Sequence, residues 1–217
     1  EDHRKRAWKY SQSVFETYQQ VDRYLGRILN GLDDETVLIV MSDHGFGSLK
    51  KDVYLNRFLI KKGFMKIKQK KCRKPFDMAA PFANIDWSRT KAYSHGLFGN
   101  IFVNLKGREP QGIVREGNDY EKVVNSLMDR LNSLRDPDEG KKVVSNIYRR
   151  QELYHGPFLR EAPDLLVVMQ NYEYITRGGY EFVGDSLFSP PGINHSGNHR
   201  MNGISFFFGP RVKKGFR

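Results

Sequence analysis

Residues 36–47 read TVLIVMSDHGFG, and this stretch decides which fold the sequence predicts. Its apolar run, Val37 to Met41, is short, unbroken and rich in β-branched side chains, which is typical of a strand buried on both faces of a parallel sheet. Asp43 and His44 follow the end of this run. Ligands of open α/β sheets bind at that edge, and zinc, manganese and iron accept carboxylate and imidazole ligands. The alternative interpretation is a polar strand-to-loop turn with a capping Asp.

The segments around this strand indicate an α/β fold. An amphipathic helix is predicted over residues 9–30, with an apolar stripe that we expect to pack in the core. A second helix is predicted over residues 119–134, with Asp119 as a candidate N-cap. Continuous apolar runs predict further buried strands at 165–169 and 204–208. Shorter elements are predicted at 52–63 (helix) and at 91–95, 101–105 and 142–149 (strands).

These elements predict one α/β domain over residues 1–217, with a mostly parallel sheet covered by helices on both faces. The formal net charge is +11, which favours acidic partners such as phosphate esters, nucleic acid or an anionic membrane surface. Eight of the residues from Lys61 to Lys74 are Lys or Arg, so we interpret residues 61–82 as a basic, irregular insertion. Nucleic-acid binding is not expected, because no recognised nucleic-acid motif accompanies the charge.

Cysteine content and hydropathy bear on the compartment. Cys72 is the single cysteine of the chain, so no internal disulfide is expected. A lone cysteine fits a reducing compartment, and we therefore expect a cytoplasmic protein. No apolar run approaches the ~18 residues of a membrane span, so no membrane-spanning segment is predicted.

A second group of candidate ligands lies at residues 194–203, NHSGNHRMNG. His195 and His199 are four residues apart, a spacing that places two imidazoles on one face of a helix. Gly197 and the preceding prolines favour a loop instead, and a loop histidine is ordinarily a surface residue. For His199 to share a site with His44, this segment must fold back beside the end of the first strand.

Four stretches, taken in order, resemble the alkaline-phosphatase superfamily, and within it the type I phosphodiesterase and nucleotide pyrophosphatase family. The family pattern of a helix, a turn and a hydrophobic strand followed by S-D-H-G is similar to residues 16–45. Its later pattern, G-x-H-R-x-x-G-I before an apolar strand and Gly-Pro, is similar to residues 197–210, GNHRMNGISFFFGP. Between them, NLKGREPQGIV at 104–114 and APDLLVV at 162–168 are also similar to members of this family. The resemblance covers nearly the whole chain.

This resemblance implies a metal-dependent hydrolase that acts on small phosphate esters or nucleotides. It implies two divalent metal ions, usually Zn²⁺ with Mn²⁺ as the alternative, at the C-terminal edge of the sheet. Asp43 and His44 match ligands of one metal, and His199 matches a ligand of the other. His195 matches no fixed position of the family pattern.

Several family features have no counterpart in these residues. The family places a nucleophilic Thr or Ser after its first strand, an Asp ligand on that strand, and an Asp-x-x-x-His pair before the helix that corresponds to 9–30. The chain therefore resembles the C-terminal portion of such an enzyme. We expect the N-terminal part of the fold and the nucleophile to lie upstream of Glu1, and the chain alone to be inactive.

Other functions remain open at this point. One is a non-catalytic domain of the same fold that binds an anionic partner through its basic surface. Another is a related activity of the superfamily, such as that of a sulfatase, phosphomutase or phosphonate hydrolase. The nucleophile segment ordinarily separates these activities, so the residues of this chain do not rank them.

Overall fold

The computed structural model describes Trp8, residues 10–68, 82–96, 98–177, 185–192 and 195–213, and Gly215. The chain divides into two compact units. Unit 1 consists of Glu1–Asp43 and Gly203–Arg217, and unit 2 consists of His44–Asn202. The single domain expected over the whole chain stays a prediction. Most of the expected basic insertion, including Cys72, lies outside the described residues.

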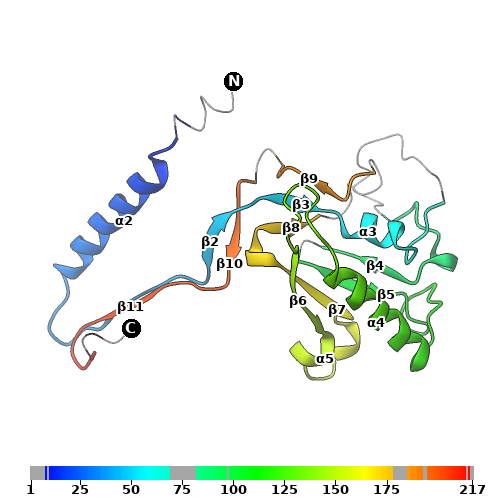
Figure 1. Cartoon of the computed structure of the whole chain (residues 1–217). Coiled ribbons are helices and arrows are strands. Elements are labelled where there is room, and N and C mark those ends of the chain that lie inside the picture. Colours follow the sequence, from blue (N-terminus) through cyan, green and yellow to red (C-terminus); the bar gives the residue numbers. More distant parts are fainter. Residues whose placement is uncertain are drawn as a thin grey trace. The chain divides into compact units, whose positions relative to one another are not determined.

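Unit 1 contains a two-stranded antiparallel ribbon, β1 (Leu38–Met41) with β11 (Ser205–Phe208), seen in Figure 1. The predicted strands at 37–41 and 204–208 are confirmed as strands. Their expected burial is wrong: β1 alternates between partly buried and exposed residues, and β11 is exposed throughout. Within the described residues each strand has one hydrogen-bonded neighbour, so no sheet surrounds either of them.

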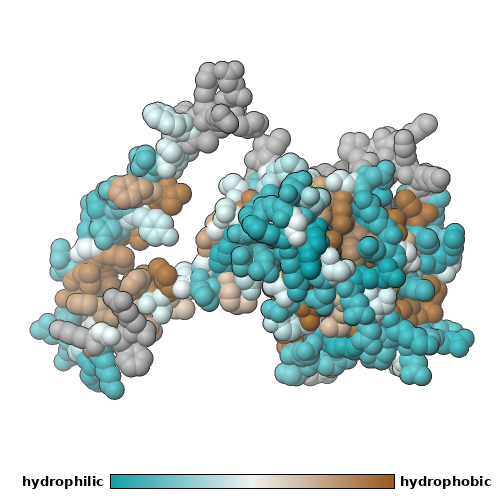
Figure 2. Space-filling model, viewed as in Figure 1, coloured by the Kyte–Doolittle hydropathy of each residue, from teal (hydrophilic) through white to brown (hydrophobic). Residues whose placement is uncertain are grey.

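The predicted helix at 9–30 is confirmed as α2 (Ser13–Leu29), although its stripe is not core. No residue of α2 is buried, and Val14 and Tyr18 expose 70% and 68% of their surface. One helix and a two-stranded ribbon do not provide enough layers to bury the apolar face of the helix and the apolar side chains of the ribbon. Figure 2 shows apolar side chains at the surface along α2. A groove of about 450 Å³ separates them from the apolar side chains of the ribbon, including Leu38 and Phe206.

Unit 2 is organised around a four-stranded sheet in the order β4 (Ala92–Ser94), β5 (Asn100–Val103), β7 (Leu165–Met169) and β6 (Val144–Arg149). Every pair in this sheet is antiparallel. The run at 165–169 is therefore an inner strand, as predicted, but an antiparallel one.

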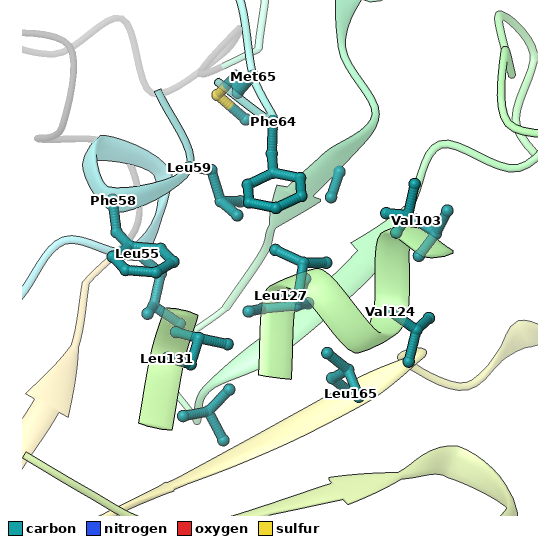
Figure 3. Packing of buried hydrophobic residues seen from close by; sticks show 14 of the residues in the cluster. Leu55, Phe58, Leu59, Phe64, Met65, Val103, Val124, Leu127, Leu131 and Leu165 are labelled. Carbon is teal, nitrogen blue, oxygen red and sulfur yellow. The ribbon is translucent and has the colours of Figure 1, made fainter. Parts of the chain in front are cut away.

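Two helices cover the core of unit 2: α3 (Leu55–Lys61) and α4 (Asn118–Asn132). Their apolar side chains meet those of β5 and β7 in Figure 3. Both helices are confirmed, but the first two residues of the helix predicted over 52–63, Asp52 and Val53, belong to a strand, and α3 begins at Leu55. The expected N-cap of α4 is wrong: Gly117 holds that position at φ 81°, and Asp119 lies in the first helical turn. The buried face of α4 consists of Tyr120, Val123, Val124, Leu127 and Leu131.

The remaining strands of unit 2 are short. β3 (Lys51–Val53) lies between β8 (Tyr174–Thr176) and β9 (Phe188–Ser189), and β2 (Gly45–Ser48) pairs with β10 (Gly197–Arg200). The 3-10 helices are η1 (Trp87–Arg89), η2 (Leu159–Glu161) and η3 (Gln170–Tyr172), and a short α-helix, α5 (Arg150–Leu153), follows β6.

The mixed α/β composition is confirmed, whereas the mostly parallel sheet is not. Among the named strands, β3 with β8 is a parallel pair, and the other pairs run antiparallel. The physical reason lies in the connections. The turn between β4 and β5 is short, and the segment from β6 to β7 carries only α5 and η2. Short connections reverse the chain, because a parallel pair needs a long crossover. In the part of the chain described here, no helix has the length and apolar character needed to cross a bilayer.

Candidate functional site

Two strands from the two ends of unit 2 bring His44 and His199 together. β2 and β10 pair antiparallel, with Gly45 opposite Arg200 and Phe46 opposite His199. The centroids of the two imidazole rings are 4.0 Å apart, and the ring planes are tilted by 57°. The expected loop at 194–203 is thus partly a strand. The fold-back that a shared site requires is present.

Glycines allow the two strands to approach closely. A Cβ atom on Gly45 would lie 2.2 Å from the backbone oxygen of Asn202, and one on Gly47 would lie 2.6 Å from Nε of Arg200. A Cβ atom on Gly197 would lie 2.2 Å from the ring of Phe46. Real Cβ atoms do not approach so closely. At Gly45 the obstacle is backbone, so the strand pairing requires glycine there, whereas at Gly47 and Gly197 a side chain would have to move.

The His44 ring is oriented by its neighbour. Its Nδ1 lies 2.8 Å from the carbonyl oxygen of Gly45, and since a carbonyl only accepts, Nδ1 donates. In the neutral imidazole the lone pair is then on Nε2, the nitrogen that a metal would bind. His199 has the ring of Phe46 edge-on at 5.8 Å. His44 is partly buried and His199 is exposed.

Arg200 holds β10 in place through backbone carbonyls. Its guanidinium donates to the carbonyl oxygen of Tyr172 at 2.8 Å and to that of Ser48 at 2.5 Å. The side-chain amide of Asn198 donates to the same Tyr172 oxygen at 3.0 Å. Tyr172 and the preceding Asn171 have φ values of 56° and 51°, a left-handed conformation that is strained for tyrosine. The turn at Tyr172 therefore serves as the anchor for β10.

The chain that leaves β2 is anchored by ion pairs. Lys50 contacts Glu173 at 2.9 Å, beside the anchor residue Tyr172. Lys51 contacts Asp136 at 2.5 Å, and the side chain of Asp136 is fully buried. Burial alone would raise the pKa of Asp136, but hydrogen bonds led by that of Lys51 lower it to about 2. Both strands of the histidine pair are thus tied to the body of unit 2.

The other candidate ligands are placed differently. Asp43 is exposed, directly precedes His44 in the chain, and belongs to unit 1. His195 is exposed, and its backbone N–H donates to the carbonyl of Gly192 at 2.9 Å. Among the described residues, no group of three or more His, Cys, Asp or Glu side chains is arranged to hold a metal ion. Among the candidate ligands in the described part of the chain, the structure thus brings the imidazoles of His44 and His199 into contact.

Arg200, Asn198 and Tyr172 were not predicted as site residues. Arg200 adjoins His199 in sequence, and on a strand adjacent side chains point to opposite faces. Once the segment is known to be a strand, this alternation indicates that His199 and Arg200 have different roles, one as a candidate ligand and the other in holding the strand. The turn at Tyr172 carries no corresponding signal, because tyrosine is uncommon in left-handed backbone.

Comparison with known proteins identifies one family. Residues 1–188 match the family described as type I phosphodiesterase / nucleotide pyrophosphatase. Asp43 and His44 lie within the matched range, and His199 lies beyond it. No curated protein and no solved structure matches the chain.

Proposed function

Because the chain belongs to the type I phosphodiesterase / nucleotide pyrophosphatase family of the alkaline-phosphatase superfamily, we propose that it supplies metal ligands to a phosphoric-ester hydrolase. Asp43 and His44 are proposed to bind one divalent ion, and His199 a second. The observation that carries this proposal is the 4.0 Å separation of the His44 and His199 rings. Metal ions of two-metal phosphoryl-transfer sites lie roughly 3.5–4 Å apart, so neighbouring rings suit neighbouring metals.

The donor set fits zinc or manganese. A carboxylate and neutral imidazoles are ligands that both ions accept. The hydrogen bond from His44 to Gly45 supports this use, because metal-bound histidines ordinarily donate their other ring N–H to an oxygen. We further propose that the remaining ligands and a nucleophilic hydroxyl are supplied by a segment N-terminal to Glu1, as in the family pattern.

The two metal ions would supply charge stabilisation at the attacking and leaving oxygens of an in-line displacement at phosphorus. The residues of this chain would hold the metal ions and orient their ligands. His44, directly before β2, and His199, on β10, would offer imidazole nitrogens to the metal ions, and Asp43 adds a negative charge that favours divalent cations. Arg200 is engaged with backbone carbonyls, so we assign it a positioning role. The net charge of +11 favours anionic substrates such as phosphate esters and nucleotides.

The test is hydrolysis of bis(4-nitrophenyl) phosphate by the complete natural protein, including any residues that precede Glu1. We expect chelation to abolish hydrolysis and zinc or manganese to restore it. Asp43→Asn is expected to lower the rate about 100-fold, whereas Asp34→Asn, which changes another exposed carboxylate, leaves it unchanged.

The alternatives give different results in the same assay. Faster cleavage of 4-nitrophenyl sulfate than of the phosphate ester would favour a sulfatase-type activity. A protein without hydrolysis, whose metal content is the same in wild type and Asp43→Asn, would contradict the proposal and favour a non-catalytic domain.

A further inference from the structure

Unit 2 contains a pocket that the proposed metal site does not use. Its volume is about 610 Å³, within the range of about 300–1,000 Å³ that is usual for small-molecule sites. Its lining comes from β3 and the residue before it, the last residue of α3, the turn after α4, and β9 with its flanking residues. Figure 1 shows β9 beside β3, and the two strands pair antiparallel. Neither His44 nor His199 is among the described residues that line the pocket.

Two lysines of the pocket already have carboxylate partners. Lys51 contacts the buried Asp136 at 2.5 Å and Asp138, which itself lines the pocket, at 2.6 Å. Lys50 contacts Glu173 at 2.9 Å. These ion pairs offset the charges of both lysines and of Asp138, so they add little net charge to the pocket.

Two further cations of the pocket have no such partner. Lys61 and Arg135 both line the pocket, and both are exposed. Neither side chain forms an ion pair with a carboxylate of the described residues. The described part of the pocket therefore carries an excess of positive charge, which favours an anionic ligand over a neutral or cationic one.

The guanidinium of Arg135 is oriented by the end of α4. Its Nη1 donates to the carbonyl oxygens of Asn132 at 3.1 Å and of Leu134 at 3.3 Å. The other two nitrogens, Nε and Nη2, present parallel N–H groups along a second edge of the guanidinium. Within the described residues these two nitrogens have no acceptor. Two parallel donors match the two oxygens of a carboxylate, so Arg135 favours a carboxylate head group.

The rest of the lining is largely apolar. Leu187 and Phe188 pack against the core of unit 2 and remain partly exposed, and both line the pocket. Pro137 and Pro190 add further apolar surface. Burying apolar surface of a ligand against these side chains stabilises the complex. The pocket therefore suits an anion with an apolar body better than a small inorganic anion.

We propose that this pocket binds a small organic anion that carries one carboxylate and an apolar ring or chain. Arg135 binds the carboxylate through Nε and Nη2, and Lys61 adds a second positive charge. The apolar body lies against Leu187 and Phe188. The proposal does not depend on the proposed hydrolase function, and either can fail without the other.

Isothermal titration of the complete natural protein with 2-naphthoate tests the proposal. Bound metal is removed first, so that the carboxylate cannot bind to a metal ion. We expect saturable binding of 2-naphthoate, and about tenfold weaker binding of 2-naphthamide, which has the same ring system without the charge. Acetate, which has the head group without the apolar body, should show no saturable binding.

Substitutions assign the binding to this pocket. Arg135→Gln should raise the Kd for 2-naphthoate about tenfold, the loss expected when charged hydrogen bonds are removed. Lys61→Gln should raise it about threefold, because an exposed charge contributes less. Lys62→Gln is the matched control and should leave the Kd unchanged, because Lys62 is exposed and is not among the described residues that line the pocket. Lys61→Gln removes no hydrogen bond or ion pair of the described residues, so it tests the site even where Arg135→Gln disturbs the end of α4.

Three results would overturn the proposal. The first is an absence of saturable binding of 2-naphthoate. The second is equal affinity for 2-naphthamide, which would make the pocket an apolar site without preference for anions. The third is an unchanged Kd in both Arg135→Gln and Lys61→Gln, which would place the binding elsewhere on the protein.

Discussion

The imidazole ring of His44 lies 4.0 Å from that of His199, although these residues stand near the two ends of unit 2. Pairing of β2 with β10 produces this proximity, and the pairing rests on glycines, one arginine and the turn at Tyr172. The histidine pair is therefore a product of long-range backbone contacts. Each of those contacts can be tested separately.

Replacement of Arg200 by lysine should loosen β10 while keeping the charge. Lysine lacks the planar fork that reaches the carbonyls of Tyr172 and Ser48 together. We expect the free energy of unfolding to fall by about 2 kcal/mol and amide hydrogen exchange in β2 and β10 to accelerate. Arg149→Lys is the control, because Arg149 bonds Glu121 and Asn125 away from these strands. Unchanged exchange in β2 and β10 would show that Arg200 does not hold them.

Alanine substitutions at the glycines should differ in cost. In Gly45→Ala the new methyl meets backbone, the oxygen of Asn202, and we expect a loss of about 3 kcal/mol in the free energy of unfolding. In Gly197→Ala it meets the ring of Phe46, which is 67% exposed and able to move, so we expect about 1 kcal/mol. Gly192→Ala meets no atom within 4 Å and serves as the control. Denaturant titration measures the loss in the free energy of unfolding for each variant. A larger loss in Gly197→Ala than in Gly45→Ala would contradict the described packing.

The Asp136 ion pair should make stability depend on acid pH. The pKa of Asp136 is lowered from 3.8 to about 2, so the carboxylate stabilises the fold above pH 3.8 and loses this effect as the pH falls through 2. This effect amounts to about 2 kcal/mol at neutral pH. We expect Asp136→Asn to be clearly less stable than wild type at pH 7, with the difference much smaller at pH 2. Urea unfolding at both pH values measures it, and Asp129→Asn, which changes an exposed residue of α4, is the control. An equal difference at both pH values would argue against the ion pair as its source.

Local elements of this fold were predictable from the sequence. Apolar runs and periodicity depend on neighbouring residues, and they predict three elements that the structure contains. These are the strand at 37–41, the inner strand at 165–169 and helix α4. His44 is predictable as a candidate ligand in the same way, because it follows the end of a strand.

Pairing and burial were not predictable in the same way. The apolar run of β1 suits a doubly buried parallel strand, but the strand pairs antiparallel with β11 and stays half exposed. The pairing of β10 with β2 and the left-handed turn at Tyr172 depend on contacts across the whole of unit 2. A pattern of neighbouring residues does not predict contacts between segments that are far apart in the sequence.

The proposed two-metal site requires that His44 and His199 bind separate metal ions. Isothermal titration of the complete natural protein with Zn²⁺, after removal of bound metal, tests it without reference to activity. We expect two bound ions in wild type and the loss of one ion in His44→Ala and of one in His199→Ala. Both ions should be retained in His155→Ala, which removes an exposed histidine elsewhere in unit 2. Unchanged zinc stoichiometry and affinity in His44→Ala and His199→Ala would contradict it.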